Sequence, residues 1–262
     1  MRARKRFGQH FLTPEWVRKV VAAIAPRRDD AFVEIGPGKG ALTVPLANAA
    51  REVVAIEIDR DLAGALPNHV PANVRVVTGD VLDIDLTTLM PRDAPRVRIA
   101  GNLPYNISSP ILFALLDAQA RDSRITDATL MLQREVADRL TARPGTRDYG
   151  VLTIMVGMRA RVSSVLVLPP GAFRPPPAVT SALVRFDFLR PDDIVAAPRS
   201  FETMVRRAFM KRRKTIANAL SGLAADRGVD IRPSLAEAGI DERRRPETLT
   251  IEELVRLARL IG

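Results

Sequence analysis

Short apolar runs alternate with longer amphipathic stretches over most of the chain. The runs are rich in Val, Ile and Ala, and several are followed directly by Gly, Asp or Asn. Apolar runs of about four to eight residues are typical of buried strands, and strands that alternate with helices indicate a parallel sheet. We expect strands at residues 31–35, 53–57, 74–78, 97–100, 128–132, 163–168 and 181–188, and helices at 41–50, 109–120 and 133–140.

This order of elements predicts an α/β fold with a doubly wound, mostly parallel sheet. Residues 191–198 have the composition of a linker, and the remainder of the chain has helical periodicity only. We therefore expect two domains, residues 1–190 and 191–262, of which the second is small and all-helical. No segment approaches the apolar length of a membrane-spanning helix, so we expect no membrane partner.

The first expected strand leads into a glycine-rich segment, Gly36-Pro-Gly38-Lys-Gly40. Glycines here permit a tight turn and a close approach of the backbone to a ligand. Glu57 ends the second strand, 21 residues after Gly36, where a carboxylate can accept from both hydroxyls of a ribose. The glycine spacing is not that of the dinucleotide fingerprint, and Lys39 lacks the following Ser or Thr of a P-loop. A mononucleoside cofactor without pyrophosphate, such as S-adenosylmethionine, therefore fits better than NAD or ATP.

Asp80 closes the third expected strand, in the sequence Gly79-Asp80-Val81. Its carboxylate is placed to accept a hydrogen bond from the amino group of an adenine. Asp is also a frequent helix N-cap and turn residue, so a purely structural role remains the alternative.

The tetrapeptide Asn102-Leu103-Pro104-Tyr105 follows the fourth expected strand. Asn102 offers a side-chain carbonyl as an acceptor, and Pro104 pushes Leu103 towards an extended conformation. The backbone carbonyl of Leu103 or Pro104 can then accept a second hydrogen bond, while Tyr105 supplies a flat apolar surface. Two such acceptors would draw the amino group of a base towards a reactive tetrahedral geometry. A simple turn after a strand remains the alternative interpretation.

Positive charge dominates the composition and is clustered near the C-terminus. Forty Lys and Arg residues against thirty Asp and Glu give a net charge of +10, which favours a polyanionic partner unless the source proteome is generally basic. Residues 206–214 hold six cations and no acid. If residues 204–223 form one helix, its apolar face comprises Val205, Phe209, Ile216, Leu220 and Leu223. Arg212 would fall near that face, and the expected phosphate-binding ridge consists of Arg206, Arg207, Lys211, Arg213 and Lys214.

Several classes of protein are disfavoured by composition. Cysteine is absent, so disulfides and thiolate metal sites are excluded, and two histidines leave little for any other zinc site. We therefore expect no metal. The basic segment Met1 to Arg6 precedes no apolar signal core, which favours a cytoplasmic protein. Nothing like a heptad seam is present, so we expect a monomer.

Taken together, these segments resemble the family of ribosomal RNA adenine N6-dimethyltransferases, and most closely its small-subunit branch. The matching segments span nearly the whole chain: Arg6–Leu12, Glu34–Gly40, Glu57–Asp59, Gly79–Leu82, Asn102–Tyr105, Pro169–Pro177, Arg212–Leu220 and Arg245–Leu254. Asn-x-Pro-Tyr alone also occurs in methyltransferases of DNA and of protein glutamine. The N-terminal Phe-Gly-Gln-x-Phe-Leu and the later Phe-x-Pro-x-Pro make the resemblance specific. It implies a seven-stranded, Rossmann-like methyltransferase sheet with a small helical RNA-binding domain.

The resemblance also implies roles for individual residues. The cofactor would be held by Gln9, His10, Leu12, Gly36, Gly38, Glu57, Asp80, Val81 and Asn102. Asn102 would lie between the methyl donor and the target amine, with Tyr105 and Phe173 stacked on an adenine turned out of its RNA stack. Core filling is the alternative role of Phe173. His10 stands where some relatives carry Asn, and Ala178 stands where relatives often carry Lys.

The implied reaction is methyl transfer from S-adenosylmethionine to N6 of two adjacent adenosines in a hairpin near the 3′ end of small-subunit (16S) rRNA, without a metal or covalent intermediate. The implied partner is the small ribosomal subunit. Two alternatives remain: an enzyme of the same chemistry that acts on large-subunit (23S) rRNA, and a non-catalytic ribosome assembly factor.

Overall fold

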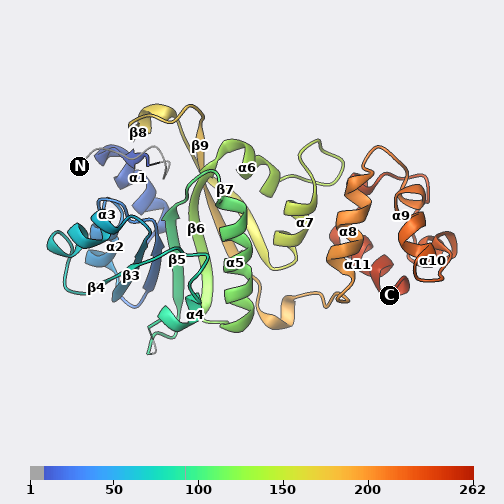
Figure 1. Cartoon of the computed structure of the whole chain (residues 1–262), viewed down its shortest axis with the longest axis horizontal. Coiled ribbons are helices and arrows are strands. Elements are labelled where there is room, and N and C mark those ends of the chain that lie inside the picture. Colours follow the sequence, from blue (N-terminus) through green and yellow to red (C-terminus); the bar gives the residue numbers. More distant parts are fainter. Residues whose placement is uncertain (1–8, 92) are drawn as a thin grey trace. The chain divides into compact units, whose positions relative to one another are not determined.

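The computed structural model describes residues 9–91 and 93–262 of the chain (Figure 1). The chain divides into two compact units, Met1–Ala137 with Arg161–Arg190, and Asp138–Ala160 with Pro191–Gly262. The sequence predicts two domains, residues 1–190 and 191–262, and the two units also meet at Arg190. The prediction and the structure differ for residues 138–160, which belong with the C-terminal helices because Tyr149 and Ile154 are buried in their core.

A seven-stranded sheet forms the centre of the first unit, with strand order β4-β3-β2-β5-β6-β9-β7. Its strands are β2 (Ala31–Ile35), β3 (Glu52–Glu57), β4 (Val74–Thr78), β5 (Val97–Asn102), β6 (Ile125–Gln133), β7 (Ala160–Leu168) and β9 (Ser181–Phe188). Neighbours from β4 to β6 are parallel, and β9 is antiparallel to β6. The expected doubly wound, mostly parallel fold is confirmed.

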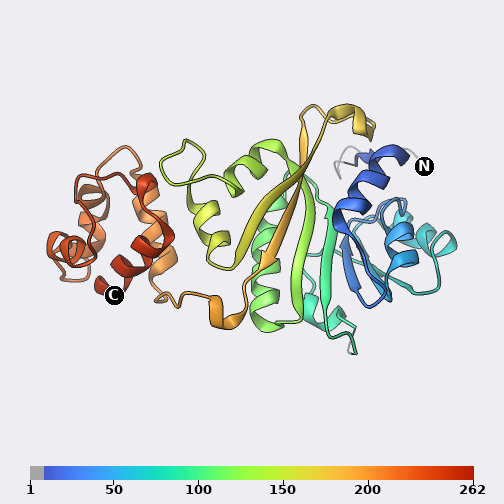
Figure 2. The same ribbon diagram turned by 180° about the vertical axis from the view of Figure 1, so that it is seen from behind.

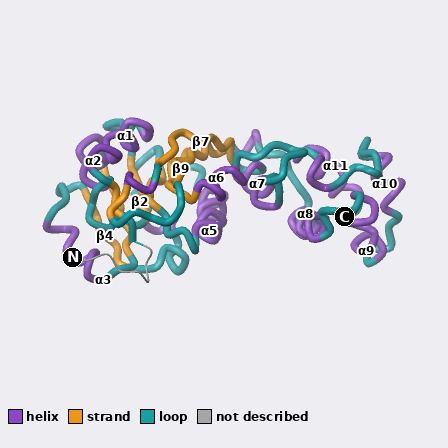
Figure 3. The backbone as a smooth tube through the Cα atoms, turned by 90° about the horizontal axis from the view of Figure 1, so that it is seen from above, coloured by secondary structure: helices purple, strands orange, loops and turns teal. Residues whose placement is uncertain are grey.

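Helices cover both faces of this sheet. The helices of this unit are α1 (Pro14–Ile24), α2 (Thr43–Ala49), α3 (Arg60–Ala65), α4 (Leu86–Leu89) and α5 (Ser108–Arg121), and α6 (Arg134–Leu140) contains the boundary between the two units. Helix α5 lies in front of the strands in Figure 1, whereas α1 lies in front of them in the reverse view of Figure 2. Figure 3 shows the strands between α1 and α2 on one side and α5 on the other. The central strands β2, β3 and β5 are buried along almost their whole length because both faces of the sheet are covered there.

A small second sheet joins two distant segments of the chain. Strand β1 (Phe11–Leu12) pairs antiparallel with β8 (Phe173–Arg174), with Leu12 opposite Phe173. Strands of two residues carry no periodic signal, and this pairing was not predicted. It brings the N-terminal segment alongside the proline-rich segment that follows β7.

The second unit is helical and has its own core. It contains α7 (Val151–Gly157), α8 (Phe201–Met210), α9 (Ile216–Ala225), α10 (Ile231–Glu237) and α11 (Ile251–Leu260). Its core is formed by Met204, Val205, Ile216, Leu220 and other buried apolar residues. A Thr250–Glu253 capping box starts α11, with Thr250 N–H donating to Glu253 at 2.8 Å.

Residues 204–223 do not form the single helix that the sequence analysis took as the condition for its cationic ridge. Helix α8 ends at Met210, and α9 begins at Ile216 after a turn that carries Lys211 and Lys214. Thr215 is the N-cap of α9, and its hydroxyl accepts from Asn218 N–H at 3.4 Å. Four adjacent cations repel one another in a continuous helix, and an N-cap residue competes for a new helix start. The predicted apolar face is nevertheless packed in or against the core of this unit, divided between two helices.

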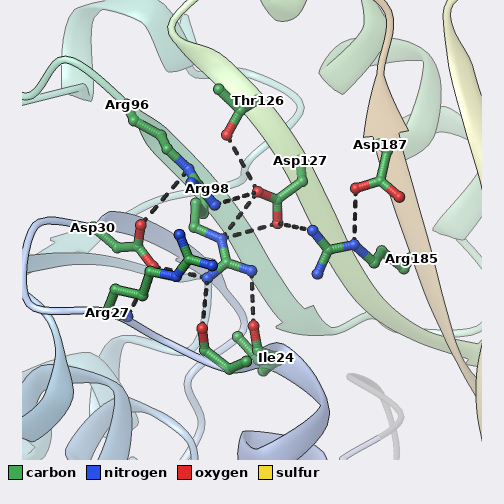
Figure 4. A network of polar contacts seen from close by, with 10 residues as sticks. Ile24, Arg27, Asp30, Arg96, Arg98, Thr126, Asp127, Arg185 and Asp187 are labelled. Atoms are coloured by element: carbon green, nitrogen blue, oxygen red, sulfur yellow. Dashed lines mark hydrogen bonds and ion pairs between the residues drawn. The ribbon is translucent and has the colours of Figure 1, made fainter.

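Arg98 is almost completely buried at the amino end of the sheet, with 2 % of its side chain exposed (Figure 4). Its Nε donates to both carboxylate oxygens of Asp127 at 3.0 Å, and Nη1 donates to Asp30 at 2.8 Å. Nη2 donates to the Ile24 carbonyl at the end of α1, at 2.7 Å. The guanidinium therefore connects α1, β5, β6 and the start of β2.

Replacement of Arg98 should destabilise the first unit strongly. In Arg98→Met the buried carboxylates of Asp30 and Asp127 lose their closest charged partner and keep only the longer contacts of 3.4–3.9 Å with Arg96 and Arg185. We expect a loss of about 3–5 kcal/mol in the free energy of unfolding, measured by urea denaturation.

The matched control is Arg121→Met, because Arg121 pairs with Asp85 on the surface and its side chain is 54 % exposed. That control should lose no more than about 1 kcal/mol. Equal losses in the two variants would contradict the structural role of Arg98.

Candidate functional site

The carboxyl ends of the parallel strands border a pocket of about 100 Å³ in the first unit. Ligands bind at this edge in open α/β sheets because the loops that follow adjacent strands converge there. All residues predicted to hold the cofactor line this pocket: Gln9, His10, Leu12, Gly36, Gly38, Glu57, Asp80, Val81 and Asn102. Leu103, Pro104 and Tyr105 line it as well. The segment 6–8 of the N-terminal motif lies outside the described residues.

The glycine-rich turn after β2 has a backbone that other residues rarely adopt. Gly36 and Gly38 have φ values of 71° and 59°. A β-carbon on Gly38 would lie 3.0 Å from the ring of Phe11, and the Lys39 ammonium lies 4.8 Å from the centre of that ring. Glycine at position 38 therefore allows the N-terminal segment to lie directly over the turn.

Glu57 is held in place by two backbone donors. Gly38 N–H donates to Oε2 at 2.9 Å, and Asp59 N–H donates to Oε1 at 3.0 Å. Burial raises the pKa of Glu57, and these two hydrogen bonds act in the opposite direction. Each carboxylate oxygen keeps a lone pair, so Glu57 can accept two further hydrogen bonds from a ligand.

Asp80 has a structural role in a turn and also lies on the pocket wall, where the sequence predicts that it accepts from an adenine amino group. Its Oδ1 accepts from Leu82 N–H at 3.0 Å in a turn, and the residue also lines the pocket. The turn uses one oxygen, which leaves Oδ2 to accept from a ligand.

Asn102 stands at the end of β5 and is oriented by the N-terminal segment. Its Nδ2 donates to the His10 carbonyl at 2.8 Å, so Oδ1 is the part of the amide that can accept from a ligand. The Pro104 carbonyl already accepts from Ile107 N–H at 3.2 Å. Of the two backbone acceptors expected in this turn, Leu103 is therefore the better candidate.

Tyr105 and His10 form a stacked pair on the pocket wall. Their ring centres are 5.9 Å apart with 19° between the planes. The Tyr105 hydroxyl shares a hydrogen bond of 2.5 Å with Ser181 Oγ, and His10 Nδ1 lies 2.8 Å from the Pro175 carbonyl oxygen. Burial raises the pKa of Tyr105, which keeps the phenol protonated.

Phe173 does not occupy the position expected of a base-stacking residue. Its side chain is 0 % exposed, and it does not line the pocket. The ring lies in an apolar cluster with Val20 and Leu168, beneath the pairing of β1 with β8. In this structure Phe173 is a core residue, which is the alternative role left open by the sequence, and its stacking on a target base stays a prediction.

Glu34 is a pocket residue that the sequence analysis did not assign. It is 1 % exposed, and its Oε2 has no hydrogen-bond partner among the described residues. Burial raises its pKa to about 7, and the nearby Glu57 carboxylate adds to this effect. The sequence offered one indication of this role: Glu34 is the acidic residue in an otherwise apolar strand, Ala31–Ile35.

Gly101 is a second residue to which the sequence analysis gave no role in the site. A β-carbon there would lie 2.5 Å from the Ile35 carbonyl oxygen on the neighbouring strand. Ile35 and Gly101 are opposite each other in the register of β2 and β5. Glycine thus permits the close approach that brings Asn102 to the glycine-rich turn.

The predicted cationic ridge lies in the second unit on α8 and on the turn that follows it. Its five members are exposed: Arg206, Arg207, Lys211, Arg213 and Lys214. Arg206 pairs with Glu202 at 2.8 Å, and Arg212 is turned inward, donating to the Thr146 carbonyl at 3.0 Å. A hollow of about 520 Å³ is lined by Met210, residues 211–214 and Asn218. None of its lining residues in the described part of the chain is acidic, so the hollow is suited to an anion.

Within residues 9–91 and 93–262, no helix is both long and apolar enough to cross a membrane. No group of three or more His, Asp or Glu side chains in the same residues is arranged to hold a metal ion.

The sheet and its pocket define a Rossmann-like methyltransferase. The chain is similar to the solved structures of a dimethyladenosine transferase from Plasmodium falciparum (TM-score 0.75, 24 % identity, 95 % of this chain and 96 % of that chain covered) and of the 23S rRNA methyltransferase ErmE (TM-score 0.70, 28 % identity, 96 % and 99 % covered).

Residues 1–261 match the family described as ribosomal RNA adenine dimethylase. Two relatives carry the name ribosomal RNA small subunit methyltransferase A. The one from Acinetobacter baylyi is 43 % identical over 261 residues, covering 98 % of this chain and 92 % of the relative. The one from Nitrosococcus oceani is 44 % identical over 265 residues, covering 98 % and 96 %. The chain belongs to the ribosomal RNA adenine dimethylase family, and the expected family is confirmed.

The raised pKa of Glu34 predicts a pH-dependent stability. Between the ordinary carboxyl value of 4.5 and about 7 the folded state keeps a proton that the unfolded state has lost. The free energy of unfolding should therefore fall as pH rises through this window, by about 3 kcal/mol at most for the ligand-free protein. Glu34→Gln should remove this part of the slope in urea denaturation at pH 5 to 8.

The control is Glu15→Gln. Glu15 lies on the surface, and its hydrogen bond with Lys19 lowers its pKa, so over most of the measured range of pH 5 to 8 it is ionised in both states. This variant should retain the wild-type pH slope. A wild-type slope in Glu34→Gln would show that Glu34 is not protonated in the folded protein.

Proposed function

We propose that this protein transfers methyl groups to N6 of two adjacent adenosines in a hairpin near the 3′ end of small-subunit (16S) rRNA, with S-adenosylmethionine as methyl donor. The product is N6,N6-dimethyladenosine, formed during ribosome biogenesis. The observation that carries the proposal is that the Asn102–Tyr105 turn and the glycine-rich turn after β2 line one pocket. Names of relatives at 43 and 44 % identity support the small subunit as the substrate.

The pocket residues fit S-adenosylmethionine in charge and in hydrogen-bonding capacity. Glu57 would accept from the two ribose hydroxyls, and Asp80 with Val81 would hold the adenine ring. Glu34, whose Oε2 has no hydrogen-bond partner in the described part of the chain, is suited to the ammonium of the methionine part, beside the glycine turn at Gly36. When bound, the cofactor supplies an activated methyl group on a sulfonium.

The residues at the acceptor side orient and polarise the amine. Asn102 Oδ1 and the Leu103 carbonyl would accept from the two N–H bonds of the adenine amino group, and Tyr105 would support the ring. Because the donor is already activated, orientation and exclusion of water supply most of the catalysis. No pocket residue is assigned as a general base, and the proton passes to solvent after transfer.

The cationic ridge is proposed to bind phosphates of the ribosomal RNA. Lys211, Arg213 and Lys214 are exposed on the turn after α8, and among the described residues none has a carboxylate within ion-pair distance. The neighbouring hollow adds an uncharged surface at Met210, which is 78 % exposed. We further propose that the enzyme acts as a monomer in the cytoplasm.

The large-subunit alternative has one observation in its favour, the similarity to ErmE at 28 % identity. The higher identity to relatives named for the small subunit weighs against it. An assembly factor without catalysis would not need Asn102, Glu57 and the glycine turn to line one pocket.

The direct test is methyl transfer from labelled S-adenosylmethionine to unmethylated small and large ribosomal subunits, followed by nucleoside mass spectrometry. Dimethyladenosine in small-subunit rRNA alone is the expected result. The same product in large-subunit rRNA would move the protein to the alternative substrate, and no product in either would leave an assembly factor.

Replacement of Asn102 should separate chemistry from RNA binding. In Asn102→Ala the amine loses its side-chain acceptor, and we expect the turnover number to fall by at least about 10²-fold. The dissociation constant for the subunit, measured by filter binding, should change little. The control is Asn106→Ala, an exposed residue four positions on that does not line the pocket. Parallel loss of binding and turnover in Asn102→Ala would argue against the assigned role.

Removal of three charges from the ridge should weaken the salt dependence of RNA binding. With Lys211, Arg213 and Lys214 all changed to Gln, the slope of log K against log salt should fall in magnitude by about 2–3. Arg232→Gln is the control, because Arg232 lies on α10, is 72 % exposed and pairs with Glu242. A triple variant with the wild-type slope would place the RNA on another surface.

A further inference from the structure

His10 lies where three parts of the acceptor side meet. Its carbonyl accepts from Asn102 Nδ2 at 2.8 Å, and its ring is stacked on Tyr105 with 5.9 Å between ring centres. Its Nδ1 lies 2.8 Å from the carbonyl oxygen of Pro175, in the segment that follows β8. The imidazole is thus held by contacts on its face and on its edge.

The neighbours of His10 keep its ring in this position. Gln9 Nε2 donates to Asp59 at 3.1 Å, and the ring of Phe11 lies over Gly38. Thr13 N–H donates to the Ala172 carbonyl at 2.9 Å. With anchors on both sides, the backbone at His10 has little freedom, and the side chain faces Tyr105.

Among residues 9–91 and 93–262, three aromatic rings line the pocket: His10, Phe11 and Tyr105. Phe11 is engaged with Gly38 and Lys39, at the glycine turn. A base that presents its amino group to Asn102 therefore has Tyr105 as its stacking surface. In the structure the His10 ring occupies that surface.

We propose that His10 closes the acceptor position when no substrate base is present, and that the target adenine replaces the imidazole in the stack on Tyr105. This inference rests on the proposed function, since it takes an adenine as the acceptor. The His10 carbonyl continues to orient Asn102 while the ring moves away, because the carbonyl belongs to the backbone.

The exchange makes His10 a determinant of substrate selection. A base enters only if its own stacking and hydrogen bonds exceed those of the imidazole. A purine has a larger ring surface than imidazole, whereas a pyrimidine gains less from the exchange. The apparent affinity for RNA is lowered by the fraction of molecules in which the position is closed.

Two variants test the exchange through kinetics at saturating S-adenosylmethionine. His10→Ala removes the ring and keeps the carbonyl, so the KM for the RNA substrate should fall roughly three- to tenfold. His10→Phe retains a ring on Tyr105, so its KM should not fall. The Kd for S-adenosylmethionine, measured by calorimetry in each variant, separates these effects from any change in cofactor binding.

A spectroscopic test follows the ring itself. The chain has two histidines, and the other, His69, is exposed and does not line the pocket. In the free protein with labelled histidine, the ring protons of His10 should be shifted upfield by Tyr105, and Tyr105→Leu should remove that shift. Addition of the target hairpin with S-adenosylhomocysteine should also remove it and leave His69 unchanged.

The inference is overturned if the upfield shift of His10 persists in the saturated RNA complex. It is equally overturned if His10→Ala has the wild-type KM together with wild-type turnover, a result that leaves the proposed function intact. Failure of the wild-type protein to methylate any ribosomal RNA is a separate result and overturns the proposed function itself.

Discussion

A buried guanidinium sets the arrangement on which the rest of the first unit depends. Arg98 neutralises Asp30 and Asp127 and caps the carbonyls at the end of α1, so it joins four elements at the amino edge of the sheet. In a buried environment such a network is stable only when every partner is present. With this edge held, the register of β2 and β5 places Gly101 and Asn102 beside the glycine turn at the opposite edge.

The short segment that contains His10 and Phe11 serves two sides of the pocket. Phe11 lies over the glycine turn where the cofactor is proposed to bind, and His10 contacts Asn102 and Tyr105 where the base is proposed to bind. One strand pairing, β1 with β8, holds both contacts in place. The segment that contains His10 and Phe11 therefore contacts both proposed ligand positions, and a displacement of this segment would affect both.

Burial shapes the chemistry of the pocket before any ligand binds. Glu34 and Glu57 are both buried, and both have raised pKa values because the low-dielectric surroundings disfavour their charged forms. Glu57 is partly compensated by two backbone N–H groups, whereas Glu34 Oε2 has no partner among the described residues. A cationic or hydroxyl-bearing ligand would satisfy these groups, and these hydrogen bonds would contribute to the proposed affinity.

The parallel sheet, the glycine turn and the positions of Glu57, Asp80 and Asn102 follow from local rules that can be read along the chain. Apolar runs predict strands, positive φ requires glycine, and the ends of parallel strands meet at one edge. The division of residues 204–223 into α8 and α9 also has local causes, the adjacent cations and the N-cap Thr215, which hydrophobic periodicity does not register. Long-range packing determined the other features, because they depend on residues far apart in the sequence. It buried Phe173 in an apolar cluster and joined residues 138–160 to the second unit. It also brought His10 onto Tyr105, a contact between residues 95 positions apart that no periodicity encodes.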